Sequence, residues 1–266
     1  MKVQALVLTG FGINCEQETA HAFALAGADT LCIHLNDLIE APERLQEAQI
    51  LAIPGGFSFG DDIASGRILA NRLRYTLGEP LQQFVQEGKL AIGICNGFQV
   101  LVKMGLLPRL DGALQQSVTL THNDSSRFED RWVHLAIDAQ TKCIWTQGIT
   151  RLEVPIRHGE GKLIVQDTAT LQRLQAQGQI VLRYANADSA PARGAYPANP
   201  NGSVDDIAGI CDPSGRIFGL MPHPEAFLYG YNHPTWTRQE ELPENGAGLQ
   251  LFQNAVQHVT TKQAAV

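Results

Sequence analysis

The sequence is short of basic side chains: among 266 residues, 20 Lys and Arg stand against 27 Asp and Glu, for a formal net charge of -7. Binding of nucleic acid needs Lys and Arg clustered against phosphates, and no basic stripe is present, so a nucleic-acid partner is not expected. Apolar runs are also short, and none approaches the roughly 18 residues that a membrane span needs. We therefore expect a soluble protein with no membrane partner.

Cysteine is scarce and odd in number: the chain has five, widely spaced, with no C-x-x-C pair. This argues against the zinc and dithiol sites whose ligands come in such pairs, and we expect no metal site. The pattern favours a reducing, cytoplasmic location and leaves single thiols available for chemistry. Pro/Ser-rich linkers, low-complexity tracts and repeats are absent too, so we expect one domain spanning residues 1–266.

The first 110 residues alternate between strand-like and helix-like segments. The opening "MKVQALVLTG" has a short apolar run followed at once by Gly10 and Gly12, which indicates a first β-strand and not a signal peptide. Further apolar runs at 31–35, 50–54 and 90–95 alternate with helix-like segments around 38–47 and 64–87. This alternation predicts an α/β fold with a mostly parallel sheet flanked by helices.

Beyond Leu110 the pattern changes to short strand-like runs with turns between them, which predicts an antiparallel strand insertion. "IAGICDPSGRIFGLMPH" places two such runs around the turn "DPSG" and predicts a hairpin, and a helix is expected near 246–258. Sites in open α/β sheets form at the carboxyl ends of strands. Three segments that follow strand-like runs should therefore converge: "PGGFSFGDD", Cys95 and "MPHPE".

Cys95 stands in "GICNG", the glycine spacing of a nucleophile elbow in a strand-turn-helix context. A sharp turn lifts the side chain off the sheet, and Gly93 and Gly97 let the two backbones approach without a Cβ clash. The helix N-terminus lowers the pKa of such a thiol, and the amide of Asn96 points to where an oxyanion would form. The same residues also fit a buried structural cysteine, so this motif alone leaves both interpretations open.

The segment "MPHPE" supplies a base and a group to orient it. In extended backbone His223 and Glu225 project to one side, and Pro224 between them stiffens the spacing. Glu225 would then bond one imidazole nitrogen while the other faces Cys95. Taken alone, His223 also fits an ordinary loop histidine bracketed by prolines.

The glycines of "IPGGFSFGDD" follow a buried strand and can present backbone N–H groups to a substrate anion. Gly55 and Gly56 would thus form part of an oxyanion hole together with Asn96. An ordinary turn accounts equally for a Gly-Gly pair on its own.

Together these motifs resemble a known family. "PGGFSFGDD", "GICNGFQVL", "HGEGKL", "YPANPNGS", "IAGI" and "GLMPHPE", with "GINCEQE" and "SSRF", are similar to the glutaminase component of phosphoribosylformylglycinamidine synthase. That family is a class I, triad-type glutamine amidotransferase of purine biosynthesis, and the resemblance covers nearly the whole chain. It implies a flavodoxin-like class I amidotransferase fold: a central, mostly parallel sheet flanked by helices, with an antiparallel strand insertion.

The resemblance also implies roles for single residues. Cys95 attacks the side-chain amide carbon of glutamine, His223 relays protons, and Glu225 orients His223. Glutamate and ammonia leave through a cysteine thioester. Substrate and oxyanion contacts are implied for Gly55, Gly56, Asn96 and Gln99.

By the same resemblance, ammonia passes to a large synthetase subunit, where ATP converts formylglycinamide ribonucleotide to the formylglycinamidine ribonucleotide. The chain shows no G-x-x-x-x-G-K-[ST] loop, so ATP and magnesium are expected on that partner and no cofactor is expected in this chain. A requirement for a small third subunit is left open. So are two other functions: an amidotransferase serving another synthetase, and a scaffolding module that has lost catalysis.

Other residues fit more than one interpretation. His158 and Glu160 in "RHGEGK" form a second His/Glu pair, which fits coupling between subunits or a plain glycine-rich connection. Cys15 lacks elbow glycines and is interpreted as structural or facing an interface. Ala226 stands where many members of the family carry Arg. Extra residues around 111–150 and 227–247 resemble the fused, single-chain synthases.

Overall fold

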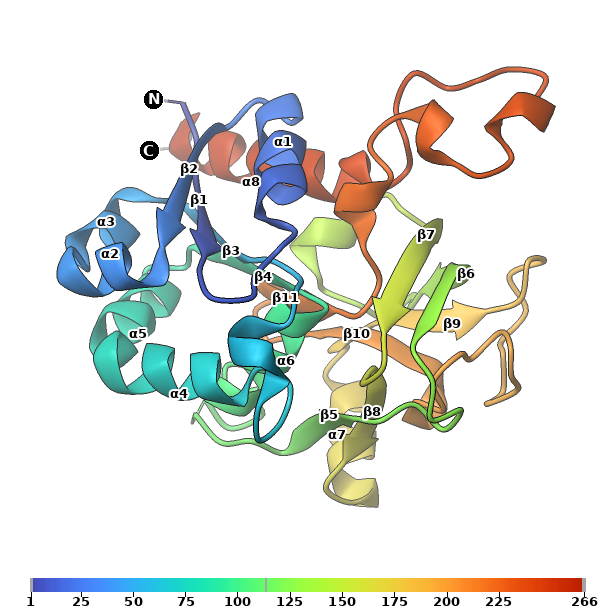
Figure 1. Cartoon of the computed structure of the whole chain (residues 1–266), viewed down its shortest axis with the longest axis horizontal. Coiled ribbons are helices and arrows are strands. Elements are labelled where there is room, and N and C mark those ends of the chain that lie inside the picture. Colours follow the sequence, from blue (N-terminus) through green and yellow to red (C-terminus); the bar gives the residue numbers. More distant parts are fainter. Residues whose placement is uncertain (1, 113, 265–266) are drawn as a thin grey trace.

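The computed structural model describes residues 2–112 and 114–264, with a nine-stranded sheet in the order β2-β1-β3-β4-β11-β10-β9-β6-β7. Helices lie on both sides of the sheet (Figure 1). The strands are β1 (Gln4–Thr9), β2 (Asp29–His34), β3 (Ile50–Ile53), β4 (Leu90–Ile94), β5 (Val118–Thr121), β6 (Glu129–Ile137), β7 (Arg151–His158), β8 (Lys162–Val165), β9 (Ile180–Ala185), β10 (Ile207–Cys211) and β11 (Ile217–Leu220).

The helices frame the parallel half of the sheet. Helices α1 and α8 lie together on one side of it, and α4, α5 and α6 lie on the other (Figure 1). Their bounds are α1 (Glu16–Leu25), α2 (Leu35–Glu40), α3 (Glu43–Glu47), α4 (Arg67–Thr76), α5 (Gly78–Gln86), α6 (Asn96–Met104), α7 (Thr168–Ala176) and α8 (Leu249–Ala264).

Strands β2, β1, β3, β4 and β11 pair in parallel, as the alternating strand and helix pattern predicted. Every residue of β3 and β4 is buried, because helices cover both faces of this half. Continuous apolar runs without alternation are the sequence mark of such strands. The predicted α/β fold is confirmed.

From β11 onward the sheet is antiparallel, through β10, β9, β6 and β7. Strands β5 and β8 form a separate antiparallel pair. The hairpin around "DPSG" is confirmed as β10 and β11. One prediction is wrong in this region. Only turns are expected between the strands, but the structure has a helix there, α7. Its signal was present, since the side chain of Asp167 caps it by accepting from the amide of Thr170 at 2.7 Å.

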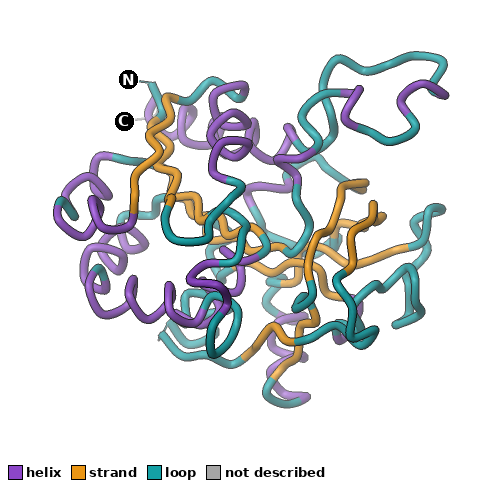
Figure 2. The backbone as a smooth tube through the Cα atoms, in the orientation of Figure 1, coloured by secondary structure: helices purple, strands orange, loops and turns teal. Residues whose placement is uncertain are grey.

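The sheet order places β3, β4 and β11 side by side, so the segments that follow them meet at one edge. The edge strand β7 also lies next to these segments: the amide of His223 donates to the carbonyl of Pro155, in β7, at 2.8 Å. The predicted convergence of the three segments is therefore confirmed. In Figure 2, strands gather at the centre, and an excursion with short helical turns, between β11 and α8, stands away from them. No helix within residues 2–112 and 114–264 combines the length and apolar character needed to cross a bilayer.

Candidate active site

Cys95 occupies the turn between β4 and α6 in a strained backbone conformation, with φ 51° and ψ -106°. Its amide donates to the carbonyl of Leu220 at 2.8 Å, which fixes the turn against the end of β11. Non-glycine residues with positive φ are uncommon, and those held in place by surrounding structure cluster at functional sites. The buried side chain lies at the helix N-terminus, as the elbow motif predicted.

The two elbow glycines are required by close backbone contacts. A methyl group added to Gly93 would lie 2.5 Å from the carbonyl oxygen of Gly97. One added to Gly97 would lie 1.8 Å from the carbonyl oxygen of Ile53, on the neighbouring strand β3. Both distances are far inside van der Waals contact. The spacing in "GICNG" therefore reflects tight packing of α6 against β3 and β4.

His223 and Glu225 form a buried pair just past β11. The Nδ1 atom of His223 lies 2.6 Å from Oε1 of Glu225, and the two residues are only 2% and 3% exposed. The predicted contact between His223 and Glu225 is present, but the predicted extended conformation of the backbone is wrong. Glu225 lies in a short 3₁₀ helix, Pro224–Ala226, so the turn and not an extended strand brings the carboxylate back to the ring.

Electrostatics favour a charged imidazole here. Burial opposes the charge, but the neighbouring Glu225 carboxylate outweighs it, together with contributions from Cys95 and Cys15, and the pKa of His223 is raised well above its ordinary value. A protonated imidazole can give its proton to a leaving group and then act as a base. The pair is thus suited to activating a thiol and to delivering a proton to a leaving group.

Gly55 packs closely against both His223 and Cys95. A methyl group added there would lie 2.8 Å from Cε1 of His223 and 3.5 Å from Cβ of Cys95. Only a residue without a side chain fits this position. Gly56 follows with φ 147°, which other residues rarely adopt.

The amides predicted for the oxyanion hole are available. Among the described residues, no hydrogen bond found outside the helices and strands uses the N–H of Gly55, Gly56 or Asn96. The loop that carries Gly55 and Gly56 is held in place, since the carbonyl of Gly55 accepts from the amide of Asn14 at 3.2 Å. The oxyanion role of Gly55, Gly56 and Asn96 stays a prediction.

The side chains of Asn96 and Gln99 tie the elbow helix to two loops. Asn96 donates to Asp61 at 2.9 Å and to Oε1 of Gln99 at 3.0 Å, and it accepts from the amide of Ser58 at 3.2 Å. Gln99 in turn donates to the carbonyl of Glu160 at 2.7 Å. Both polar atoms of Gln99 are therefore engaged within the protein, and its contact with glutamine stays a prediction.

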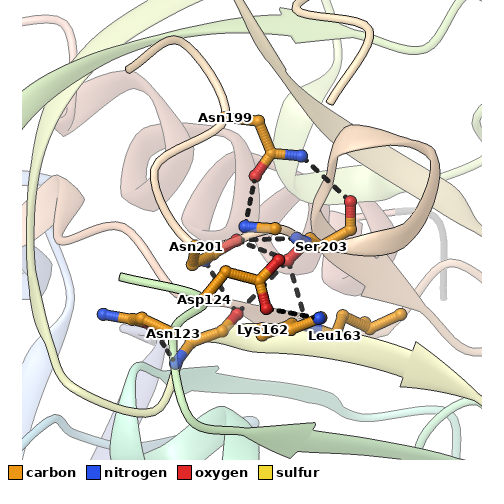
Figure 3. A network of polar contacts seen from close by, with 9 residues as sticks. Asn123, Asp124, Lys162, Leu163, Asn199, Asn201 and Ser203 are labelled. Carbon is orange, nitrogen blue, oxygen red and sulfur yellow. Dashed lines mark hydrogen bonds and ion pairs between the residues drawn. The ribbon is translucent and has the colours of Figure 1, made fainter. Parts of the chain in front are cut away.

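The end of β7, which leads into the loop before β8, borders the site through its backbone. The carbonyl of Arg157 lies 3.7 Å from Sγ of Cys95. Two contacts fix the loop. Asn201 donates to the carbonyl of Gly161 at 2.9 Å. Lys162 pairs with Asp124 at 2.5 Å, as Figure 3 shows. Several separate polar contacts thus hold this wall of the site in place.

His158 and Glu160 do not pair with each other. His158 is buried and its Nδ1 lies 3.2 Å from Oδ1 of Asn123. Burial, assisted by the nearby His223, lowers the pKa of His158 to about 3, so the ring is neutral. Glu160 lies 3.7 Å from His122. The "HGEGK" histidine is therefore part of the loop's internal structure.

Sequence reasoning missed the position of Cys15, which it interpreted as structural or facing an interface. The Sγ of Cys15 lies 3.3 Å from the point that a methyl group on Gly55 would occupy. One ligand atom each from Cys15, His223 and Glu225 lies within 4.8 Å of the others. No local motif signals this, because the turn before α1 meets the end of β11 only in the folded chain. Within residues 2–112 and 114–264, these three side chains meet the separation that a shared metal ion would require.

Comparison with known proteins places this geometry in a family. The family described as a CobB/CobQ-like glutamine amidotransferase domain matches residues 2–259. The phosphoribosylformylglycinamidine synthase subunit PurQ of Dehalococcoides mccartyi is 50% identical over 257 residues, covering 96% of this chain and 97% of that protein. The subunit of the same name from Methanococcus maripaludis strain S2 is 45% identical over 266 residues, with 96% and 97% covered.

Solved structures agree with the sequence relatives. The structure of PurLQS from Thermotoga maritima matches with a TM-score of 0.73 and 28% identity, covering 97% of this chain and 100% of that chain. A glutamine amidotransferase from the same organism matches with a TM-score of 0.57 at 13% identity, covering 98% and 99%. The second likeness concerns the fold alone.

Proposed function

The chain belongs to the PurQ family of phosphoribosylformylglycinamidine synthase subunits, and we propose that Cys95, His223 and Glu225 carry out its glutaminase reaction. As a glutaminase subunit it supplies ammonia for the synthesis of formylglycinamidine ribonucleotide in purine biosynthesis. One observation supports the assignment of the residues above all. A cysteine in a strained elbow faces a buried His/Glu pair across a glycine that leaves no room for a side chain.

In the proposed reaction, the sulfur of Cys95 attacks the side-chain amide carbon of glutamine and forms a tetrahedral oxyanion. Amides of Gly55, Gly56 and Asn96 stabilise the negative oxygen. The C–N bond breaks while His223 gives its proton to the departing ammonia, which leaves a thioester on Cys95. Water attacks the thioester with His223 as base, and glutamate and the free thiol are regenerated.

Ammonia released here would be used on the synthetase subunit. The structure of PurLQS contains a protein similar to this chain within a complex, which supports a partner of that kind. We propose that ATP and magnesium bind on that large subunit and that this chain needs neither for glutamine hydrolysis. A small third subunit is a further proposed partner.

The match of a single family over residues 2–259 supports one amidotransferase domain for the chain. We also propose that the subunit works in the cytoplasm. Its five cysteines are free thiols, which suits a reducing compartment.

The experiment is a glutamine hydrolysis assay on the purified chain, alone and with the co-purified synthetase subunit, ATP and formylglycinamide ribonucleotide. The Cys95→Ala variant should lose hydrolysis, while Cys32→Ala, at an exposed thiol away from the site, should keep it. An electrophilic glutamine analogue should label Cys95 in the wild type.

Three results would reject parts of the proposal. Normal hydrolysis by Cys95→Ala would remove Cys95 from the mechanism. Ammonia-dependent turnover that never becomes glutamine-dependent, with no labelling of Cys95, would favour a scaffolding module. Activation by a different synthetase, and not by this one, would point to another amidotransferase.

A further inference from the structure

A cluster of positive side chains lies at the edge of the sheet opposite to Cys95 and His223. Gly88 stands just before β4 and Arg216 just before β11, the parallel strands whose other ends lead to Cys95 and His223. The point that a methyl group on Gly88 would occupy lies 3.3 Å from Nζ of Lys262, in α8, and 3.5 Å from Cζ of Arg216. Both positive charges therefore adjoin the same small space, in a chain whose net charge is -7.

This cluster contains buried donors without a partner. Nε of Arg216 and Nε2 of His258, which lies one turn before Lys262 in α8, make no hydrogen bond within residues 2–112 and 114–264. Burial and the positive charges of Arg216 and Lys262 lower the pKa of His258. Buried polar atoms are normally paired, and like charges repel each other, so the cluster calls for an anion.

The carboxylate closest to the cluster along the chain is already engaged. Glu87 lies next to Gly88, and its Oε2 is 2.9 Å from Nζ of Lys89. Lys89 also donates to the carbonyl of Gln46 at 2.6 Å. Glu87 and Lys89 therefore neutralise each other and leave the charges of the cluster uncompensated.

A cavity of about 420 Å³ adjoins the cluster. Its wall combines Gly88, His258 and Lys262 of the cluster with the apolar residues Leu90 and Val259. Sites for small molecules have volumes of roughly 300–1,000 Å³ and pair apolar walls with a few polar groups. The cavity thus has the size and the composition to hold a small anion with an apolar part.

We propose that this cavity binds a phosphate monoester that carries an apolar body. The phosphate lies against Arg216 and Lys262, and the body lies against Leu90 and Val259. A guanidinium can bind two phosphate oxygens at once, and an ammonium adds a point charge. Two positive charges match the phosphate dianion, whereas a carboxylate would neutralise only one of them. The length of β4 and β11 separates this ligand from the glutaminase site, so it does not compete with glutamine.

The test titrates the purified full chain with phenyl phosphate, and with inorganic phosphate, benzoate and phenol for comparison. Calorimetry should give one site per chain for phenyl phosphate, and inorganic phosphate should bind about tenfold more weakly because it leaves the apolar wall uncovered. Benzoate, with one negative charge, and phenol, with none, should bind more weakly than phenyl phosphate. In NMR spectra the amide signals of Gly88 and Val259 should shift, and that of Gly97 should not.

Variants that remove one charge locate the phosphate. Lys262→Gln and Arg216→Gln should each weaken binding of phenyl phosphate about tenfold or more, and Arg216→Lys, which keeps the charge, should lose less. Arg74→Gln, at an exposed cation in α4, is the matched control and should bind as the wild type does. Circular dichroism checks that each variant is folded. Because Lys262 is exposed, Lys262→Gln decides the matter even where Arg216→Gln does not fold.

Equal affinity of Lys262→Gln and the wild type for phenyl phosphate would overturn the site, and so would the absence of binding at millimolar concentration. Benzoate binding as tightly as phenyl phosphate would reject a phosphate as the ligand. A shift of the Gly97 amide in place of Gly88 would put the ligand at the glutaminase site and overturn the proposal. Glutamine hydrolysis is measured separately, and its absence in the wild type would reject the proposed function and leave the phosphate site standing.

Discussion

Nδ1 of His223 and Oε1 of Glu225 lie 2.6 Å apart in a buried setting, and this contact fixes the orientation of the imidazole ring. With Nδ1 bound to the carboxylate, Nε2 is the nitrogen left to exchange protons with Cys95 and the leaving group. The carboxylate also stabilises the imidazolium that forms during the reaction.

Replacing the carboxylate by an amide tests this role. Glu225→Gln keeps the shape but removes the charge, so the pKa of His223 should fall and the rate constant kcat should drop about 100-fold or more. KM for glutamine should change little, because Glu225 does not border the substrate. Steady-state glutaminase kinetics measure both. Glu153→Gln, at a half-exposed carboxylate near His134 and His233, should retain activity. An unchanged kcat in Glu225→Gln would remove the carboxylate from the mechanism.

Close packing at the elbow leads to a stability prediction. A methyl group on Gly97 would meet the carbonyl of Ile53 at 1.8 Å, so Gly97→Ala must push α6 away from β3. We expect a loss of about 3 kcal/mol in the free energy of unfolding, together with loss of glutaminase activity. Gly78→Ala is the control, since no atom lies within 4 Å of the added methyl group. Urea unfolding of both variants measures the loss. Equal urea midpoints for Gly97→Ala and Gly78→Ala would contradict the close packing.

Much of this site could be predicted from local sequence. Each predicted segment follows a buried strand, and parallel strands place such segments at one edge, so Cys95, Gly55 and His223 could be placed together. The contact of His223 with Glu225 could also be predicted, but the prediction assumed an extended backbone that the structure does not have. Pro224 fits the first position of the 3₁₀ turn, but proline also favours extended backbone in the residue before it, so local sequence alone does not distinguish the two conformations.

Other parts depend on tertiary packing. Cys15 lies near His223 because β1 pairs with β3, which places the turn between β1 and α1 beside the loop after β3. The carbonyl of Ile53 limits Gly97 only because β3 is the neighbour of β4. Neither relation has a local motif. Helix α7 is different, because a local signal for it exists: Asp167 is a typical N-cap residue. The strand-like segments on either side favour a turn at this position instead.

His158 leads to a prediction about pH. Its pKa is about 3 in the folded protein, below the ordinary value of about 6.5, because burial disfavours the charged ring. The unfolded chain therefore binds a proton that the folded chain does not as pH falls below 6.5. Stability from this group is fully present above that value and is lost progressively toward pH 3. Between pH 7 and pH 5 the loss should be about 2 kcal/mol.

His158→Asn should remove this pH-dependent loss of stability. The variant loses its contact with Asn123 at every pH, so the comparison concerns only the change between pH 7 and pH 5. His223, whose raised pKa acts in the opposite direction, is present in both proteins, so most of its contribution cancels in the subtraction. Urea unfolding at both pH values measures the difference. Equal acid sensitivity of variant and wild type would show that His158 titrates normally when folded.

Asn123 connects the loop after β7 to the site, and its replacement should loosen that loop. Its Oδ1 accepts from the amide of Gly161 at 3.0 Å, and its Nδ2 donates to the carbonyls of Arg127 and His158 at 2.9 and 2.8 Å. Asn123→Ala leaves these buried groups unpaired, which should cost about 1–3 kcal/mol each where water cannot enter. The same loop holds Gln99 through the carbonyl of Glu160.

We therefore expect faster hydrogen exchange at the amide of Gly161 and a higher KM for glutamine in Asn123→Ala. Asn186→Ala removes the bonds of another asparagine side chain, at 3.3 and 3.2 Å, but in an exposed turn, and should change neither quantity. Exchange at Gly161 as slow as in the wild type would show that Asn201 and Ser203, which also contact its carbonyl, hold the loop without Asn123. A raised KM without faster exchange would mean that the side chain acts on the substrate by another route than loop order.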